Sequence, residues 1–462
     1  MTTWKIAFAI GSAKPLASPS KHVWKLAWPS IVSNLLFTSV GFMHIKIVAE
    51  LGTSSVAAVT TGHRVFFLVQ AIFMGVSVAS TALVARSWGA NQPRHAEQVA
   101  WASILLSVAL AALLSIPVVL FPSHIAGLFG LDAQTTQLAA SFIFYLGIFT
   151  VFSTTSMMLS TALRATGDVI TPLWFLFFSS VLNVSFAYLL AFGVGPFPKL
   201  GVAGVALGGS VAGLMVTSAF VAFWWRGKFA LKAVKRLWLD VTVARQLISI
   251  AAPAIAEQAI VQLSFLVFFA IIARYGVEAY AAYGIGISLV SFSIVIGFGF
   301  GIATATIVGQ QLGAGNPDAA IAAAWRSLRM AVVAMSTLSV LSAWYARDLA
   351  EFMIDDPQVI DLTVAFIYMI ALLQPLMACE FTLAGALRGA GDTRFPLMAT
   401  FCGIFFGRLL PASVFAYLGF SVYWIFAVMI LDYSIKASLL FYRFRSKKWL
   451  NISLTTATPT LG

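Results

Sequence analysis

The chain has 462 residues, of which 60% are hydrophobic and only 10% are charged, and its mean hydropathy is +0.95. Soluble globular domains do not carry so much apolar surface, so the composition excludes a soluble enzyme or a soluble binding domain. The net charge of +12 would suit a nucleic-acid partner if the basic residues formed one patch. They are instead spread over several loops, and no nucleic-acid partner is expected.

Apolar runs of membrane-spanning length recur along the whole chain, since about 20 helical residues cross about 30 Å of hydrocarbon. The runs are continuously apolar rather than alternating, which disfavours the strands of a membrane barrel. The sequence therefore predicts an all-α membrane protein with twelve transmembrane helices. In chain order the runs are Leu26–Val48, Val56–Val84, Val99–Phe121, Thr136–Leu163, Leu173–Val194, Gly201–Trp225, Ile248–Ile272, Ala279–Val308, Ile321–Tyr345, Val359–Leu387, Phe395–Leu418 and Val422–Tyr442.

Basic residues favour one set of loops. They are frequent before the first run, after the even-numbered runs and after the last run, as with Lys21, Arg226 and Arg445, and they are scarce in the other loops. Because Lys and Arg are enriched in cytoplasmic loops, both termini and the central linker are predicted to be cytoplasmic. We expect a multi-pass protein of the plasma membrane, which is the inner membrane in a Gram-negative bacterium.

Two segments of the chain repeat each other. Residues Ala162–Pro172 read ALRATGDVITP and residues Ala386–Pro396 read ALRGAGDTRFP, an offset of 224 with six of eleven positions identical. The same offset pairs Pro29 with Pro253. A repeat of this length predicts two copies of one structural unit. Since six spans return each copy to the same side, the copies are expected to be related by a pseudo-twofold axis along the membrane normal, with the site of action between them.

The repeat and the spans predict the domain organisation. We expect a cytoplasmic lead-in over residues 1–25, a six-helix bundle over 26–225, a cytoplasmic linker over 226–246, a second six-helix bundle over 247–442 and a cytoplasmic tail over 443–462.

The repeated segments contain Arg164 and Asp168, with their copies Arg388 and Asp392, between the fourth and fifth spans of each half. Glycine and aspartate at such positions end a helix and turn the chain. We expect cytoplasmic turns in which the Arg and the Asp pair with each other or cap neighbouring helices. A latch that closes an inner gate is the functional alternative.

Three motifs together resemble the multidrug and toxic compound extrusion (MATE) family. They are the twice-occurring LR-x-x-GD-x-x-x-P, the LGAGNP element around Gly313, and the stretch from Phe197-Pro198 to Ala206. The resemblance covers almost the whole chain. It implies two six-helix bundles, alternating access, and export of organic cations or other amphiphiles in exchange for protons or sodium. It also implies kinship with lipid flippases and polysaccharide exporters.

The chain departs from the family pattern where many similar members carry carboxylates. His44 stands where they have an Asp in the first span, and Ala187 follows the retained Asn183 where they have a second Asp. Another branch uses acidic residues at the positions of Val261 and Met377 here. The cation site of the family is therefore not carried over to this chain. Sodium is a less expected coupling ion than the proton, since the first half lacks the carboxylates that a hard cation prefers.

Ionisable residues inside spans are costly and are functional candidates by default. In the second half, Glu257, Glu380, Asp432 and Arg408 lie roughly 10–20 Å from the expected cytoplasmic ends of their spans. Three carboxylates against one arginine leave an excess of acid, so one carboxyl is expected to exchange protons. The hypothesis is that Glu257 and Glu380 couple protons and Arg408 modulates them. The alternative is that Glu380 or Asp432 pairs with Arg408 and holds helices together.

The first half instead carries basic candidates, His44, Lys46, His63 and Arg64. Histidine changes charge between about pH 5 and 8, so His44 is a further coupling candidate; the alternative is a histidine of the core. Arg64 is a second charge modulator, expected to meet a carbonyl, Gln70 or an anionic group. Adaptable Met and aromatic side chains suit loosely specified ligands. The substrate-pocket candidates are Asn183, Gln70, Gln262, Phe292 and Met157.

These observations predict a secondary active exporter, a drug or xenobiotic antiporter that moves amphiphilic organic solutes out of the cytoplasm against protons by alternating access. The alternative is a flippase or exporter of a lipid-linked or anionic metabolite, which the basic first half would suit. An enzyme is not expected, since neither HExxH nor a P-loop occurs. No catalytic residue, metal site or cofactor is predicted. The expected partners are a small-molecule substrate, protons and the lipid bilayer, and we expect the chain to function as a monomer.

Overall fold

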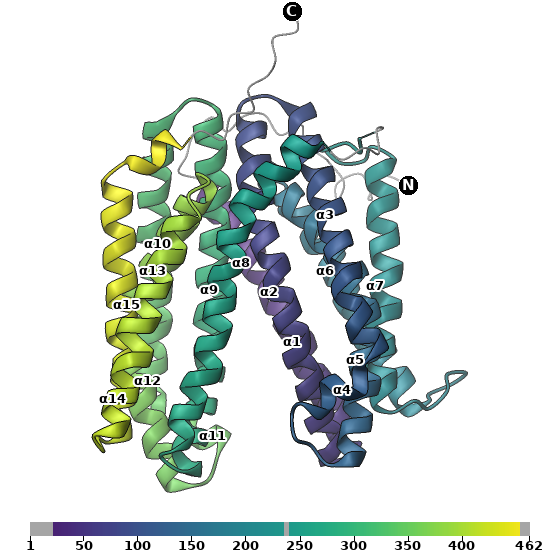
Figure 1. Ribbon diagram of the computed structural model, residues 1–462, viewed down its shortest axis with the longest axis vertical. Coiled ribbons are helices and arrows are strands. Elements are labelled where there is room, and N and C mark those ends of the chain that lie inside the picture. Colours follow the sequence, from purple (N-terminus) through teal and green to yellow (C-terminus); the bar gives the residue numbers. More distant parts are fainter. Residues whose placement is uncertain (1–21, 235–239, 453–462) are drawn as a thin grey trace, which may run out of the picture. The chain divides into compact units, whose positions relative to one another are not determined.

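The computed structural model describes residues 22–234 and 240–452, and within these ranges the chain is helical and contains no strand (Figure 1). Among the described residues, twelve helices are long and apolar enough to cross a membrane. The predicted all-α fold class with twelve spans is therefore confirmed. Residues 1–21, 235–239 and 453–462, which belong to the predicted lead-in, linker and tail, lie outside the described residues.

The helices follow the predicted apolar runs closely. They extend past several runs by one or two turns, because polar residues beyond the hydrocarbon continue the helix, as at the start of α8. The spans of the first half are α1 (His22–Ala49), α2 (Thr53–Gly89), α3 (Pro93–Leu120), α5 (Ala133–Thr166), α6 (Ile170–Phe192) and α7 (Val202–Trp225). Those of the second half are α8 (Val241–Ala273), α9 (Val277–Gly313), α10 (Pro317–Trp344), α12 (Pro357–Gly389), a composite span of α13 (Arg394–Cys402), η1 (Gly403–Leu409) and α14 (Leu410–Tyr417), and α15 (Val422–Arg445).

Three short helices lie between or after the spans and were not predicted, since none is long enough to appear as an apolar run. They are α4 (Pro122–Gly127), α11 (Ala346–Met353) and the 3₁₀-helix η2 (Lys448–Asn451).

The repeat in the sequence reappears in the helix boundaries. The ends of α2 and α9 are 224 residues apart, and so are the ends of α3 and α10. Gly52 and Gly276 precede α2 and α9 with φ of 106° and 105°, a conformation that favours glycine. The repeated sequence therefore encodes the same order of helices twice.

The chain divides into two compact units. The first unit is Val32–Ser249, and the second joins the described residues 22–31 to those from Ile250 onward. In the first unit α2 packs most extensively on α5, and in the second α9 packs on α12. The start of α1 belongs to the second unit because Trp24 lies against Phe300 of α9, with ring centroids 6.3 Å apart. The predicted domain boundaries themselves stay a prediction.

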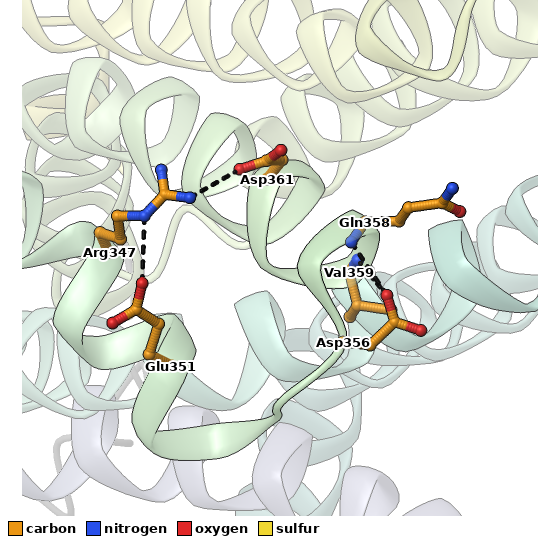
Figure 2. Close-up of polar contacts among 6 residues, drawn as sticks. All are labelled: Arg347, Glu351, Asp356, Gln358, Val359 and Asp361. Atoms are coloured by element: carbon orange, nitrogen blue, oxygen red, sulfur yellow. Dashed lines mark hydrogen bonds and ion pairs between the residues drawn. The ribbon is translucent and has the colours of Figure 1, made fainter.

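Aspartates cap the corresponding long helices of the two units. Asp356 accepts the N–H groups of Gln358 and Val359 at 2.9 and 3.4 Å and so caps α12 (Figure 2). Asp132 accepts the Thr135 N–H at 3.1 Å and caps α5. Hydrogen bonds from the Thr135 side chain and backbone lower the pKa of Asp132.

A small ion-pair network links α11 to the start of α12. Arg347 on α11 contacts Glu351 at 3.1 Å and Asp361 on α12 at 3.3 Å (Figure 2). All three side chains are more than half exposed. Exposed pairs contribute little stability, so this network orients α11 rather than holding the unit together.

Candidate functional site

Charged side chains from four spans meet in the interior of the second unit. We call this set the ion-pair cluster. It comprises Glu257 on α8, Glu380 and Arg388 on α12, Arg408 on η1, and Asp432 and Lys436 on α15. It contains three carboxylates and three cations, so the fully ionised cluster is neutral.

Asp432 is the most enclosed member of the ion-pair cluster. Its side chain is 0% exposed and contacts both Arg408 and, at 3.1 Å, Lys436 one helical turn further on. Gly407 and Gly403 lie directly against Asp432, where any side chain would collide with it. These two glycines therefore allow the composite span to approach α15 closely enough for Arg408 to reach Asp432.

Arg408 lies on a π-helical segment, η1, in the middle of the composite span. Single π-helical turns inside α-helices are rare and occur often at functional sites. The guanidinium is surrounded by the rings of Phe265, Phe268 and Tyr433, at 5.8 to 6.0 Å from their centroids. Aromatic faces stabilise a desolvated cation. Arg408 is thus fixed by Asp432 and by aromatic packing.

Glu257 forms the second part of the ion-pair cluster. Its Oε1 accepts from Arg388 Nη2 at 2.5 Å and from the Thr400 hydroxyl at 3.0 Å. The Glu257 side chain is 4% exposed, and its Oε2 has no hydrogen-bond partner among the described residues. One carboxylate therefore joins α8, α12 and α13.

The predicted excess of acid in the second half was wrong. Lys436 was missed and Arg388 was assigned to a turn, although both supply positive charge to the cluster. Arg408 pairs with Asp432, and the predicted proton-coupling residues Glu257 and Glu380 pair with Arg388 and Lys436 instead. A sequence signal for Lys436 existed, since it follows Asp432 by four residues in one span and must share its helix face.

The first unit contains a separate histidine cluster. His44 on α1 is buried, and its Nε2 lies 2.6 Å from Asn183 Oδ1 on α6. Because that amide oxygen accepts, Nε2 carries the hydrogen and donates it. The His44 ring stacks on His63 of α2, with centroids 5.7 Å apart and planes at 20°. The His63 ring in turn meets the edge of Phe142. Arg64, predicted as a modulator, is exposed.

The predicted pocket residues are divided between the two units. Gln70 donates to Met157 Sδ at 3.5 Å between α2 and α5 in the first unit, whereas Gln262 on α8 is partly buried and Phe292 on α9 is half exposed in the second. An apolar groove of about 590 Å³ does lie between α12 and α15. None of the predicted residues lines it.

The repeated turns cap helices, as one of the two structural alternatives predicted. Asp168 accepts the Thr171 N–H at 3.0 Å at the start of α6, and Asp392 accepts the Phe395 N–H at 3.3 Å at the start of α13. Asp392 also accepts from Arg443 Nε at 2.8 Å.

The other alternative, a bond between the Arg and the Asp of each turn, is wrong. Arg388 pairs with Glu257, and the only side-chain contact that the described residues give Arg164 is the Thr161 hydroxyl at 3.4 Å. Within the part of the chain that the structure describes, no three His, Cys, Asp or Glu side chains are placed to hold a metal.

Comparison with known proteins identifies the family of this chain. The sequence model of the MatE family matches residues 29–189 and again residues 253–414, which together make up most of the chain. This protein belongs to the MATE family. The two matched segments correspond to the two copies of the internal repeat, so the predicted family is confirmed.

Individual relatives agree over nearly the whole length. The chain is 26% identical over 443 residues to a probable multidrug resistance protein NorM from Thermotoga maritima, with 93% of each chain covered. It is 25% identical over 343 residues to a FAD transporter from Shewanella oneidensis, covering 73% and 75% of the two chains. Its fold matches a MOP superfamily transporter from Pyrococcus furiosus with a TM-score of 0.88 at 17% identity, over 95% and 98% of the two chains.

MATE membership sets the broad function. The family consists of multidrug efflux transporters, which are membrane transporters rather than enzymes. The protein is accordingly a multi-pass membrane protein with twelve spans that acts on small-molecule substrates.

Proposed function

We propose that this MATE protein is a secondary active antiporter that exports amphiphilic organic solutes in exchange for protons. The ion-pair cluster is the observation that carries the proposal. A buried carboxylate must be neutralised either by a cation or by a proton. Because the ionised cluster is neutral, uptake of one proton leaves one buried cation unmatched. The cluster therefore has two charge states that favour different helix contacts, which an alternating-access cycle requires.

Glu380 is the carboxylate best suited to take up the proton. Its side chain is 18% exposed, against 4% for Glu257 and 0% for Asp432. Its contact with Lys436, at 3.6 Å, is the longest within the cluster, and its Oε2 has no partner among the described residues. Lys436 keeps Asp432 at 3.1 Å when Glu380 is protonated. Protonation of Glu380 therefore weakens the contact between α12 and α15 without isolating the lysine.

Glu257 is the second member of the proposed proton-coupling pair. One of its oxygens receives two donors, and the other has no partner among the described residues. Protonation there would release Arg388 at the end of α12. Protonation of either glutamate thus changes a contact of α12, with Glu257 of α8 in one case and with Lys436 of α15 in the other. In this account Arg408 and Asp432 form the fixed part of the cluster.

His44 adds a titratable group in the unit whose spans α1, α2, α5, α6 and α7 contain no Asp or Glu. Its ring lies against His63, and two adjacent imidazolium charges repel each other. A state in which both histidines are positively charged is therefore disfavoured. We assign His44 a supporting role in coupling, beside the glutamates.

The test is accumulation of a fluorescent cation, ethidium, and a fluorescent anion, carboxyfluorescein, in cells that express the protein. The proposal predicts that expression lowers accumulation of one of these probes and that a protonophore abolishes the difference. Accumulation of both probes that is unchanged by expression, or lowered equally with and without a proton gradient, would contradict the antiporter.

An anionic substrate is the second candidate. Lys46 and Arg64 are exposed on spans of the first unit that contain no carboxylate. A relative of 25% identity is a FAD transporter, and the pyrophosphate group makes FAD an anion. The same assay separates the two candidates, since an anion exporter lowers carboxyfluorescein accumulation and leaves ethidium unchanged.

The proposal also covers the orientation of the protein in the membrane and its oligomeric state. We infer that the protein lies in the plasma membrane with both termini in the cytoplasm, since the central linker and the end of α15 are rich in Lys and Arg. We also propose that it functions as a monomer. A cysteine introduced at Ser446 should react with a membrane-impermeant maleimide only after the membrane is opened.

A further inference from the structure

The two copies of the internal repeat carry an arginine at the same position, but the two arginines have different partners. Arg388 in the second unit has the carboxylate of Glu257 at 2.5 Å. Arg164 occupies the corresponding position in the first unit, 224 residues earlier, and the residue that corresponds to Glu257 is Ser33. The first unit therefore has the cation of this pair without its carboxylate.

Arg164 contacts the first of two neighbouring hydroxyl groups. Its Nη2 is 3.4 Å from Thr161 Oγ1, which lies 2.9 Å from the Ser77 hydroxyl on α2. The corresponding residues of the second unit are Gly385 and Gly301, whose backbones pack directly on each other. In the unit that lacks the carboxylate, the hydroxyl groups of Thr161 and Ser77 therefore take the place of a contact between two glycines.

The first unit places no carboxylate against Arg164 among its described residues. Its spans α1, α2, α5, α6 and α7 contain no Asp or Glu, and Glu97 on α3 accepts the Lys232 N–H. Asp168 caps α6. A partly buried guanidinium at the end of a span needs an anion or the carbonyl end of a helix. Arg388 lies at the corresponding position at the end of α12, and its anion is the carboxylate of Glu257.

We propose that Arg164, Thr161 and Ser77 form a binding site for an oxyanion, the carboxylate or phosphate group of a bound molecule, in the place that Glu257 fills in the second unit. A guanidinium fork and hydroxyl donors match the oxygen atoms of either group. The site does not rest on proton coupling or on the direction of transport. It concerns only which chemical group the first unit binds.

The experiment measures binding to the purified full-length protein in a neutral detergent at low salt. Carboxyfluorescein anisotropy reports a soluble oxyanion. Nanodiscs of phosphatidylcholine with phosphatidylglycerol, followed by native mass spectrometry, report an anionic lipid headgroup. The variants are Arg164→Gln, Arg164→Lys and Ser33→Glu, which places a carboxylate at the position of Glu257. Arg274→Gln, in the exposed turn between α8 and α9, is the matched loss of one positive charge.

We expect Arg164→Gln and Ser33→Glu to weaken carboxyfluorescein binding about tenfold or more, with a smaller loss in Arg164→Lys and none in Arg274→Gln. Loss of bound phosphatidylglycerol in the same variants would support the site with a lipid as the source of the oxyanion. Thermal unfolding of each variant checks that it is folded. Unchanged binding of both probes in folded Arg164→Gln and Ser33→Glu overturns the site.

Discussion

Lys436 Nζ on α15 lies 3.6 Å from the carboxylate of Glu380 on α12. The same ammonium group lies 3.1 Å from Asp432, so one cation serves two carboxylates on different helices. This sharing distinguishes Glu380 from the other acids of the ion-pair cluster, since Lys436 keeps its contact with Asp432 when Glu380 loses its charge, and the cluster then carries one extra positive charge. The relationship couples protonation to the contact between two spans.

Removing the charge of Asp432 should reduce the stability of the fold more than removing that of any other carboxylate of the ion-pair cluster. Asp432→Asn leaves Arg408 without its counter-ion in the interior, and breaking a buried ion pair from one side costs about 3–5 kcal/mol. We expect a large loss of thermal stability in detergent, measured by size-exclusion chromatography after heating. The double change Arg408→Gln with Asp432→Asn should recover part of that loss. A single variant as stable as the wild type would show that the pair is not buried as described.

Gly407 should be required for the close approach of the composite span to α15. A Cβ there would lie 2.7 Å from Asp432 Cα, so Gly407→Ala must displace a helix backbone. Overpacking of this kind costs about 1–3 kcal/mol. Gly41→Ala on α1 is the control, since a Cβ there meets nothing within 4 Å. Equal unfolding temperatures for the two variants would argue against tight packing at η1.

His44 should contribute both a hydrogen bond and a proton site. His44→Ala leaves the buried Asn183 oxygen without its donor, at a cost of about 1–3 kcal/mol. His44→Gln keeps an N–H donor but does not titrate. We expect His44→Gln to retain thermal stability and to weaken the dependence of transport on pH. A wild-type pH profile in that variant would remove His44 from the coupling scheme.

The spans and the repeat were predictable because the bilayer imposes them on the sequence. Each crossing needs a long apolar run, and the constant offset between Pro29 and Pro253 required matching helices. The short helices α4 and α11 gave no such signal. Neither did the π-helical turn around Arg408, whose residues form part of one continuous predicted span.

The pairing inside the units was harder to predict. His44 and Asn183 are 139 residues apart, and Arg388 and Glu257 are 131 apart, so only tertiary packing brings them together. Sequence reasoning found Glu257, Glu380, Asp432 and Arg408 as intramembrane charges, and its structural alternative, that Glu380 or Asp432 pairs with Arg408, holds for Asp432. It did not find the partners of Glu257 and Glu380, which are Arg388 and Lys436. Counting every charge in the spans would have included Lys436 and removed the false excess of acid.

The central claim is that Glu257 and Glu380 couple transport to protons. The direct test reconstitutes the double variant Glu257→Gln with Glu380→Gln into liposomes and imposes a pH gradient on solute uptake. The control is Glu351→Gln, which removes an exposed carboxylate that pairs with Arg347 on α11 (Figure 2). The account predicts that the double variant loses gradient-driven uptake while it still binds the solute, and that the control transports normally. Gradient-driven uptake at the wild-type rate in the double variant would contradict the account.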